Sequence, residues 1–223
     1  TVDKAEDDFE VADIVNHKAV GLMAKWCIEN NCKFLHISTD YVYDGNSLVP
    51  YTEKDKENPL NNYGKSKFQG DIVCQQNNPS YIIIRTGWLY SSFGNNFLTN
   101  MIKLMQKKDK IEVVNDQFGS PTYAGDLAKT IFDLIVNKKW YPGIYNYTNR
   151  GKISWYDFAK EIKYICGFNT AITPISSEKY IQKAKRPKYS VLDNSKIINT
   201  FKIKQIDYKS SLKKCIKILK NES

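Results

Sequence analysis

The feature that most constrains the fold is the alternation of short apolar segments with longer amphipathic segments. Residues 33–38 (KFLHIS) and 81–85 (YIIIR) are runs typical of buried parallel strands, and a helical pattern covers residues 61–77 between them. This order predicts an α/β fold, with a Rossmann-like doubly wound parallel sheet. Only a predicted helix at about 9–30 precedes the first of these strands. The sheet's N-terminal strands are therefore expected to be absent from this chain.

The rest of the chain continues the alternation less regularly. Further helices are predicted at 97–106, 124–136, 154–166 and 208–220, and further strands at 111–114, 143–147 and 172–175. We predict a partial dinucleotide-binding and catalytic domain over residues 1–140. A smaller substrate-binding lobe is predicted over residues 141–223, with some segments interleaved.

Open α/β sheets bind ligands at the carboxyl ends of their strands. Ser38 and Thr39 end one predicted strand, residues 85–88 follow the next, and Tyr63 begins the helix between them. These three segments are therefore expected to converge.

Tyr63 and Lys67 are four residues apart, so on a helix they lie on one face. An ammonium there is expected to stabilise the phenolate and lower the tyrosine pKa below about 10. Such a tyrosine can transfer a proton to a carbonyl oxygen, to which Thr39 could supply a second hydrogen bond. Taken alone, the same spacing also suits two residues on a solvated helix face.

Composition excludes several classes of function. The formal charge of the 223 residues is +9, but Arg85, Arg150 and Arg186 are the only arginines, and nucleic-acid binders favour arginine. The five cysteines contain no Cys-x-x-Cys pair, and we expect free thiols in a reducing compartment. With no apolar run long enough for a membrane helix, a cytoplasmic protein is expected.

Eight sequence blocks resemble one family. They are VDKAE at 2–6, HISTDYVYDG at 36–45, PLNNYGKSK at 59–67, RTGWLY at 85–90, GNNF at 94–97, DQFGSPTY at 116–123, SWYDFAKEI at 154–162 and RPKYS at 186–190. In this order they are similar to the dTDP-4-dehydrorhamnose reductases, within the extended short-chain dehydrogenase/reductases.

The resemblance implies reduction of the C4 ketone of dTDP-4-dehydro-L-rhamnose by NADPH or NADH. By similarity Tyr63 donates the proton, Thr39 polarises the carbonyl, and Lys67 tunes Tyr63. Ser38, Tyr63 and Lys67 are the residues that the resemblance assigns to the cofactor.

Five residues are assigned to the dTDP-sugar by the same resemblance, and four of them have a structural alternative. Thr39 and Asp40 would contact the sugar, although Asp40 could instead cap a turn. Trp88 would pack against the deoxysugar or cap the core. Asn96 would contact the nucleotide or form a turn, and Arg186 would bind the diphosphate or form a structural ion pair.

The resemblance fails at the N-terminus, where the family has a strand and a Gly-x-x-Gly-x-x-Gly turn for the pyrophosphate. No such motif is present, so we expect a fragment or truncated product. Some members bridge a dimer with Mg²⁺, but Gly125 aligns with one ligand position. We therefore expect no metal site, while the resemblance allows a homodimer.

Two other functions remain open at this point. The first is a non-catalytic NADP-binding regulatory subunit, like that of methionine adenosyltransferase. The second is another nucleotide-sugar reductase or epimerase, which would share Thr39, Tyr63 and Lys67.

Overall fold

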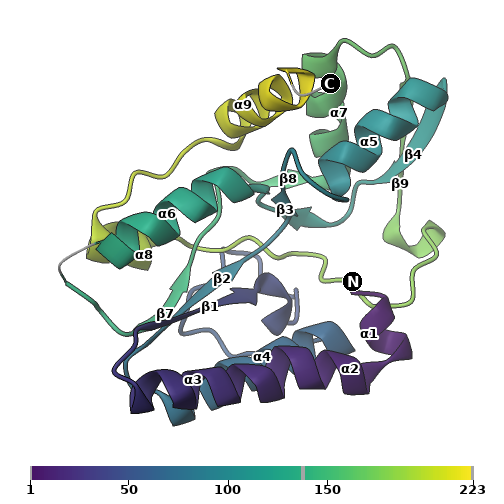
Figure 1. Cartoon of the computed structure of the whole chain (residues 1–223). Coiled ribbons are helices and arrows are strands. Elements are labelled where there is room, and N and C mark those ends of the chain that lie inside the picture. The colour runs from purple at the N-terminus through teal and green to yellow at the C-terminus, as the bar shows by residue number, and fades with distance from the viewer. Residues whose placement is uncertain (1, 137–138, 222–223) are drawn as a thin grey trace. The chain divides into compact units, whose positions relative to one another are not determined.

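Three parallel strands position the segments that carry Thr39 and Tyr63. In the computed structural model, which describes residues 2–136 and 139–221, the strands are β1 (Phe34–Thr39), β2 (Tyr81–Thr86) and β7 (Gly143–Asn146). Their order is β1-β2-β7, and Thr39 pairs with Thr86 at the carboxyl edge (Figure 1). The predicted α/β class with a parallel sheet is confirmed.

Helices that precede and follow β1 build up one side of this sheet. Helices α3 (Ala19–Glu29) and α4 (Asn62–Asn77) contact the strands, whereas α1 (Lys4–Asp7) and α2 (Phe9–Asp13) contact α4. Figure 1 shows α3 and α4 side by side along one face of the strands, and the two helices are in contact. Val20 and Ala24 of α3 pack with Cys74 of α4 and Ile83 of β2 in a buried apolar cluster.

The predicted helix over 9–30 is interrupted by one wider turn. Ile14–Lys18 forms a π-helix between α2 and α3, and the three segments run on without a break. The carbonyl oxygen of Asn16 in this turn lies against Gly70, where any Cβ would overlap it. The Asn16 side chain also donates to Ser66 Oγ at 3.0 Å, so the π turn is fitted closely to α4.

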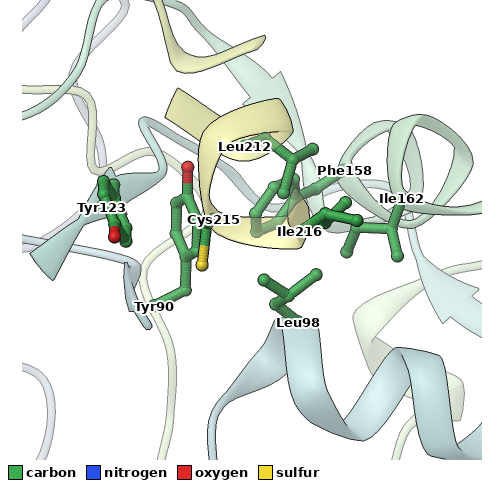
Figure 2. Close-up of a cluster of buried hydrophobic side chains, with 8 residues drawn as sticks. All are labelled: Tyr90, Leu98, Tyr123, Phe158, Ile162, Leu212, Cys215 and Ile216. Atoms are coloured by element: carbon green, nitrogen blue, oxygen red, sulfur yellow. The ribbon is translucent and has the colours of Figure 1, made fainter. Parts of the chain in front are cut away.

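A second group of elements buries a mainly aromatic and aliphatic core. Its helices are α5 (Phe97–Lys107), α7 (Trp155–Cys166) and α9 (Tyr208–Asn221). Figure 2 shows side chains of all three helices pointing toward one another, with Tyr90 and Tyr123 beside them. Strand β4 (Lys110–Val114) pairs in parallel with β9 (Ala171–Ile175). Two further pairs join β3 (Leu89–Tyr90) to β6 (Thr122–Tyr123) and β5 (Phe118–Gly119) to β8 (Ile153–Ser154).

Both groups are compact units assembled from separate parts of the chain. Unit 1 comprises Thr1–Thr86, Leu134–Tyr147 and Gln182–Lys202, and unit 2 comprises Gly87–Asp133, Thr148–Ile181 and Ile203–Ser223. Helix α6 (Ala124–Val136) contributes residues to each. The division into functional domains at about residue 140 stays a prediction.

Most predicted elements begin and end within two residues of the observed ones, and α6 has the predicted bounds. The sequence analysis missed α1, α8 (Ser195–Phe201), the short strands β3, β5, β6 and β8, and the 3₁₀ turns Asp40–Val42 and Ser177–Lys179. Each of these is seven residues or shorter, which is too short for a hydrophobic period to be recognised.

Candidate active site

The first turn of α4 fixes Tyr63. The Asn61 side chain caps the helix by accepting from Gly64 N at 2.7 Å, and Glu6 Oε1 accepts from Asn62 N at the same distance. Gly64 lies so close to the Tyr41 carbonyl that a side chain there would overlap it. The Asn61 cap and the close approach of Gly64 to the Tyr41 carbonyl therefore fix the backbone around Tyr63.

Thr39 and Tyr63 come together as the converging segments require. Strand β1 ends at Thr39, whose hydroxyl lies near that of Tyr63 and donates to Asp40 Oδ1 at 3.1 Å. The Tyr41 ring meets the Tyr63 ring edge-to-face, with centroids 6.0 Å apart. Two neighbouring hydroxyls can both reach one carbonyl oxygen of a substrate.

The expected lowering of the Tyr63 pKa by Lys67 is wrong in this structure. Burial raises the pKa of Tyr63, the carboxylates of Asp40 and Asp71 raise it further, and the Thr39 hydrogen bond opposes them. Lys67 Nζ instead donates to the Ile37 carbonyl oxygen at 2.6 Å. The physical reason is that the ammonium satisfies its hydrogen bonds on β1, not on the phenol.

Two buried polar groups adjoin this pair. Burial raises the pKa of Asp40 to about 6, although hydrogen bonds from Ser190 and Thr39 lower it. Burial raises the pKa of Asp71, and the Ser38 hydroxyl beside it opposes that shift. Within the described residues, Ser38 Oγ has no hydrogen-bond partner of ordinary length and angle. Ser38 and Asp40 thus retain polar capacity inside a buried site.

Arg186 forms the structural ion pair that the sequence analysis gave as its alternative role. Its Nη2 donates to Asp3 Oδ2 at 2.9 Å, and Asp3 Oδ1 also accepts from Ala184 N. The arginine holds the pKa of Asp3 below its usual range. A contact from Arg186 to the diphosphate stays a prediction.

Trp88 and Asn96, both in unit 2, have structural partners of their own. The Trp88 indole stacks on Trp155 with centroids 3.4 Å apart, and its backbone has a φ of 49°. Gly119 lies so close to the indole that a Cβ would overlap it. Asn96 caps α5 in a reciprocal capping box with Thr99. Sugar and nucleotide contacts from these residues stay predictions.

Four residues near the candidate site were missed by the sequence analysis. They are His36, Asp71, Arg85 and Ser190. Asp71 could have been found, because Tyr63, Lys67 and Asp71 are spaced by four and share one helix face. His36 and Ser38 are two residues apart on strand β1, so they lie on the same face of the sheet. No sequence signal indicates Ser190, whose contact with Asp40 is long-range.

Among the residues that the structure describes, there is neither a cluster of metal-binding side chains nor a membrane-spanning helix. Residues 2–136 and 139–221 hold no group of three or more His, Cys, Asp or Glu side chains that could bind a metal ion. Within the same ranges, every helix is too short or too polar to cross a bilayer.

Comparison with known proteins assigns this geometry to a family. The RmlD substrate binding domain family matches residues 1–221. A dTDP-4-dehydrorhamnose reductase of Aggregatibacter actinomycetemcomitans is 38% identical over 223 residues, covering 96% of this chain and 76% of the relative.

Solved structures agree with the sequence comparison. A dTDP-4-dehydrorhamnose reductase of Clostridium acetobutylicum has a TM-score of 0.95 at 40% identity, covering 99% of this chain and 78% of the other. The enzyme of that name from Bacillus anthracis, in complex with NADP, has a TM-score of 0.93 at 34% identity, covering 98% and 77%. With a matching family over nearly its whole length, this chain belongs to the RmlD substrate binding domain family, as its sequence blocks predicted.

Proposed function

We propose that this protein is an NADPH-dependent dTDP-4-dehydrorhamnose reductase, which reduces the C4 ketone of dTDP-4-dehydro-L-rhamnose. The observation that carries the proposal is the proximity of the Tyr63 hydroxyl to Thr39 at the end of β1, one helical turn from the buried Lys67. Relatives at 34–40% identity bear this enzyme name, and one of them was solved with NADP.

Tyr63 supplies the proton in this reaction, because a tyrosine hydroxyl is protonated at neutral pH and burial raises its pKa further. Thr39 donates a second hydrogen bond to the oxygen that becomes the alcohol. Thr39 has a single hydroxyl hydrogen, which Asp40 Oδ1 accepts in this structure, so this hydrogen turns from Asp40 to the ketone oxygen for the reaction.

The residues present fit the ribose end of a nicotinamide cofactor. Ser38 Oγ is a buried hydroxyl without a hydrogen-bond partner in the described residues, and Lys67 is a buried ammonium with three donors. Ser38, Tyr63 and Lys67 would hold that end. The cofactor, when bound, supplies the hydride that reaches the ketone carbon.

The test is a coupled binding and turnover experiment on the full-length protein. NADPH oxidation should follow addition of dTDP-4-dehydro-L-rhamnose, and the product should co-elute with dTDP-L-rhamnose. A UDP-4-keto sugar serves as the matched control substrate and should react much more slowly. Cofactor binding without turnover of either sugar would contradict the proposal and point to a binding protein. A cytoplasmic location and a homodimer remain predictions.

A further inference from the structure

Lys67 has an unusual set of neighbours for a buried amine. Its side chain extends from α4 to strand β1, where Nζ donates to the Ile37 carbonyl at 2.6 Å. His36 precedes Ile37 on the strand, and its Nε2 atom lies 3.4 Å from Lys67 Nζ. An ammonium carries three donors and no acceptor. The Ile37 carbonyl and His36 Nε2 must therefore both act as acceptors.

His36 can be that acceptor only when it is neutral. The side chain is buried, and burial together with the Lys67 charge lowers its pKa to about 3. Neutral imidazole has one donor nitrogen and one acceptor nitrogen. Because Nε2 faces an ammonium, the proton belongs on Nδ1.

The nearest carboxylate is already committed elsewhere. Asp71 Oδ2 accepts from Arg85 Nε at 3.1 Å, and both side chains are fully buried. Asp71 Oδ1 lies 3.8 Å from His36 Nε2, too far for a hydrogen bond, and has no hydrogen-bond partner in the described residues. Arg85 also donates to Glu57 and Tyr43.

The charged groups of the helices before α4 have partners of their own. Asp13 pairs with His17 and Lys18 in the neighbouring helices. Asp71 is therefore the carboxylate that acts on Lys67, and it raises a lysine pKa that burial lowers.

We propose that His36 is a positioning residue for Lys67: its neutral imidazole accepts a hydrogen bond from the ammonium and, with the Ile37 carbonyl, holds Lys67 charged and in place. This proposal rests on the proposed function, because Lys67 matters to turnover only if the site is a reductase site. It assigns to His36 a role through Lys67, without contact to substrate or cofactor.

Two variants separate positioning from packing. His36→Leu keeps an apolar volume and removes the acceptor, whereas His36→Gln retains an acceptor near the position of Nε2. Turnover by His36→Leu should fall about 10²-fold, with a smaller change in the KM for the sugar. His36→Gln should recover most of this loss.

The pH profile gives a readout that packing alone would not move. Without the acceptor, burial favours the neutral amine, so the basic limb of the kcat profile in His36→Leu should move down by about one pH unit. His17→Leu is the matched control, since this second histidine bonds Asp13 and lies away from the site. Its profile should match that of the wild type.

A direct titration distinguishes failure of this proposal from failure of the proposed function. In protein labelled with ¹³C at lysine Cε, the Lys67 signal is assigned through its loss in Lys67→Gln. Its pKa should be about one unit lower in His36→Leu and near the wild-type value in His36→Gln. An unchanged Lys67 pKa in folded His36→Leu would overturn the proposal, whether or not the protein reduces a sugar.

Discussion

The interiors of the two units are built from different chemistry. Around Tyr63, unit 1 buries Lys67, Asp71, Arg85 and Asp40, and it leaves one oxygen of each carboxylate without a hydrogen-bond partner in the described part of the chain. Around Phe158, unit 2 buries rings and aliphatic side chains (Figure 2). The difference indicates that unit 1 retains reactive groups at the expense of stability, whereas unit 2 is packed for shape.

Unit 2 does bury one carboxylate, and it treats that group differently. Asp126 accepts from both Asn149 Nδ2 and the Ser211 hydroxyl. A satisfied carboxylate of this kind rigidifies a core. The unsatisfied oxygens of Asp40 and Asp71 in unit 1 suit a site where polar ligands bind.

The largest effect that this comparison predicts is on turnover in unit 1. Tyr63→Phe should lower kcat by about 10²–10⁴-fold, because the hydroxyl acts as the general acid. Binding of dTDP-rhamnose should be nearly unchanged, since the ring and its contact with Tyr41 remain. Steady-state kinetics and calorimetry check both; a kcat within a factor of a few of wild type would remove Tyr63 from the mechanism.

In unit 2 the largest effect should be on stability. Phe158→Ala removes a fully buried ring that stacks on Phe97, and it should cost about 3–5 kcal/mol. Tyr164→Ala, on the same helix but 80% exposed, should change the free energy of unfolding by less than about 0.5 kcal/mol. Urea denaturation measures both, and equal losses would contradict the packing assigned to α7.

Asp40 should make unit 1 sensitive to pH. Its folded pKa of about 6 lies above the unfolded value, so the folded state binds the extra proton and stability falls as pH rises from about 4 to 6. Asp40→Asn removes this loss. The stability of the variant relative to wild type should therefore be about 2 kcal/mol more favourable at pH 7 than at pH 4. If the stability of the variant relative to wild type is the same at both pH values, Asp40 is not desolvated.

The smallest effect concerns the stacked indoles of unit 2. Trp155→Ala should destabilise the protein by at least about 1 kcal/mol through loss of the stack on Trp88. If Trp88 also packs against the sugar, the KM for the sugar should rise while kcat changes little. A stability loss with an unchanged KM would leave Trp88 a structural role alone.

The sequence predicted local features better than long-range ones. The bounds of β1 and α4, and hence the meeting of Thr39 with Tyr63, followed from hydrophobic period and cap residues. The family and the α/β class followed from sequence blocks and are confirmed.

What the sequence did not indicate depends on contacts between distant residues. The direction taken by Lys67 is set by a carbonyl 30 positions away. The partner of Arg186 is Asp3, 183 positions away, which spacing cannot indicate. The two units each combine three segments, and the sequence pattern did not indicate which segments join each unit.

The π turn at Ile14–Lys18 has a consequence for any change in chain length. A π turn holds one residue more than an α turn, so deleting one residue there would restore a regular helix. Each residue turns a helix by about 100°, and the deletion would rotate Phe9–Asp13 away from α4 while Val20 kept its place. Insertions and gaps of one residue among relatives should therefore be aligned within this turn, and an engineered helix swap should begin after it.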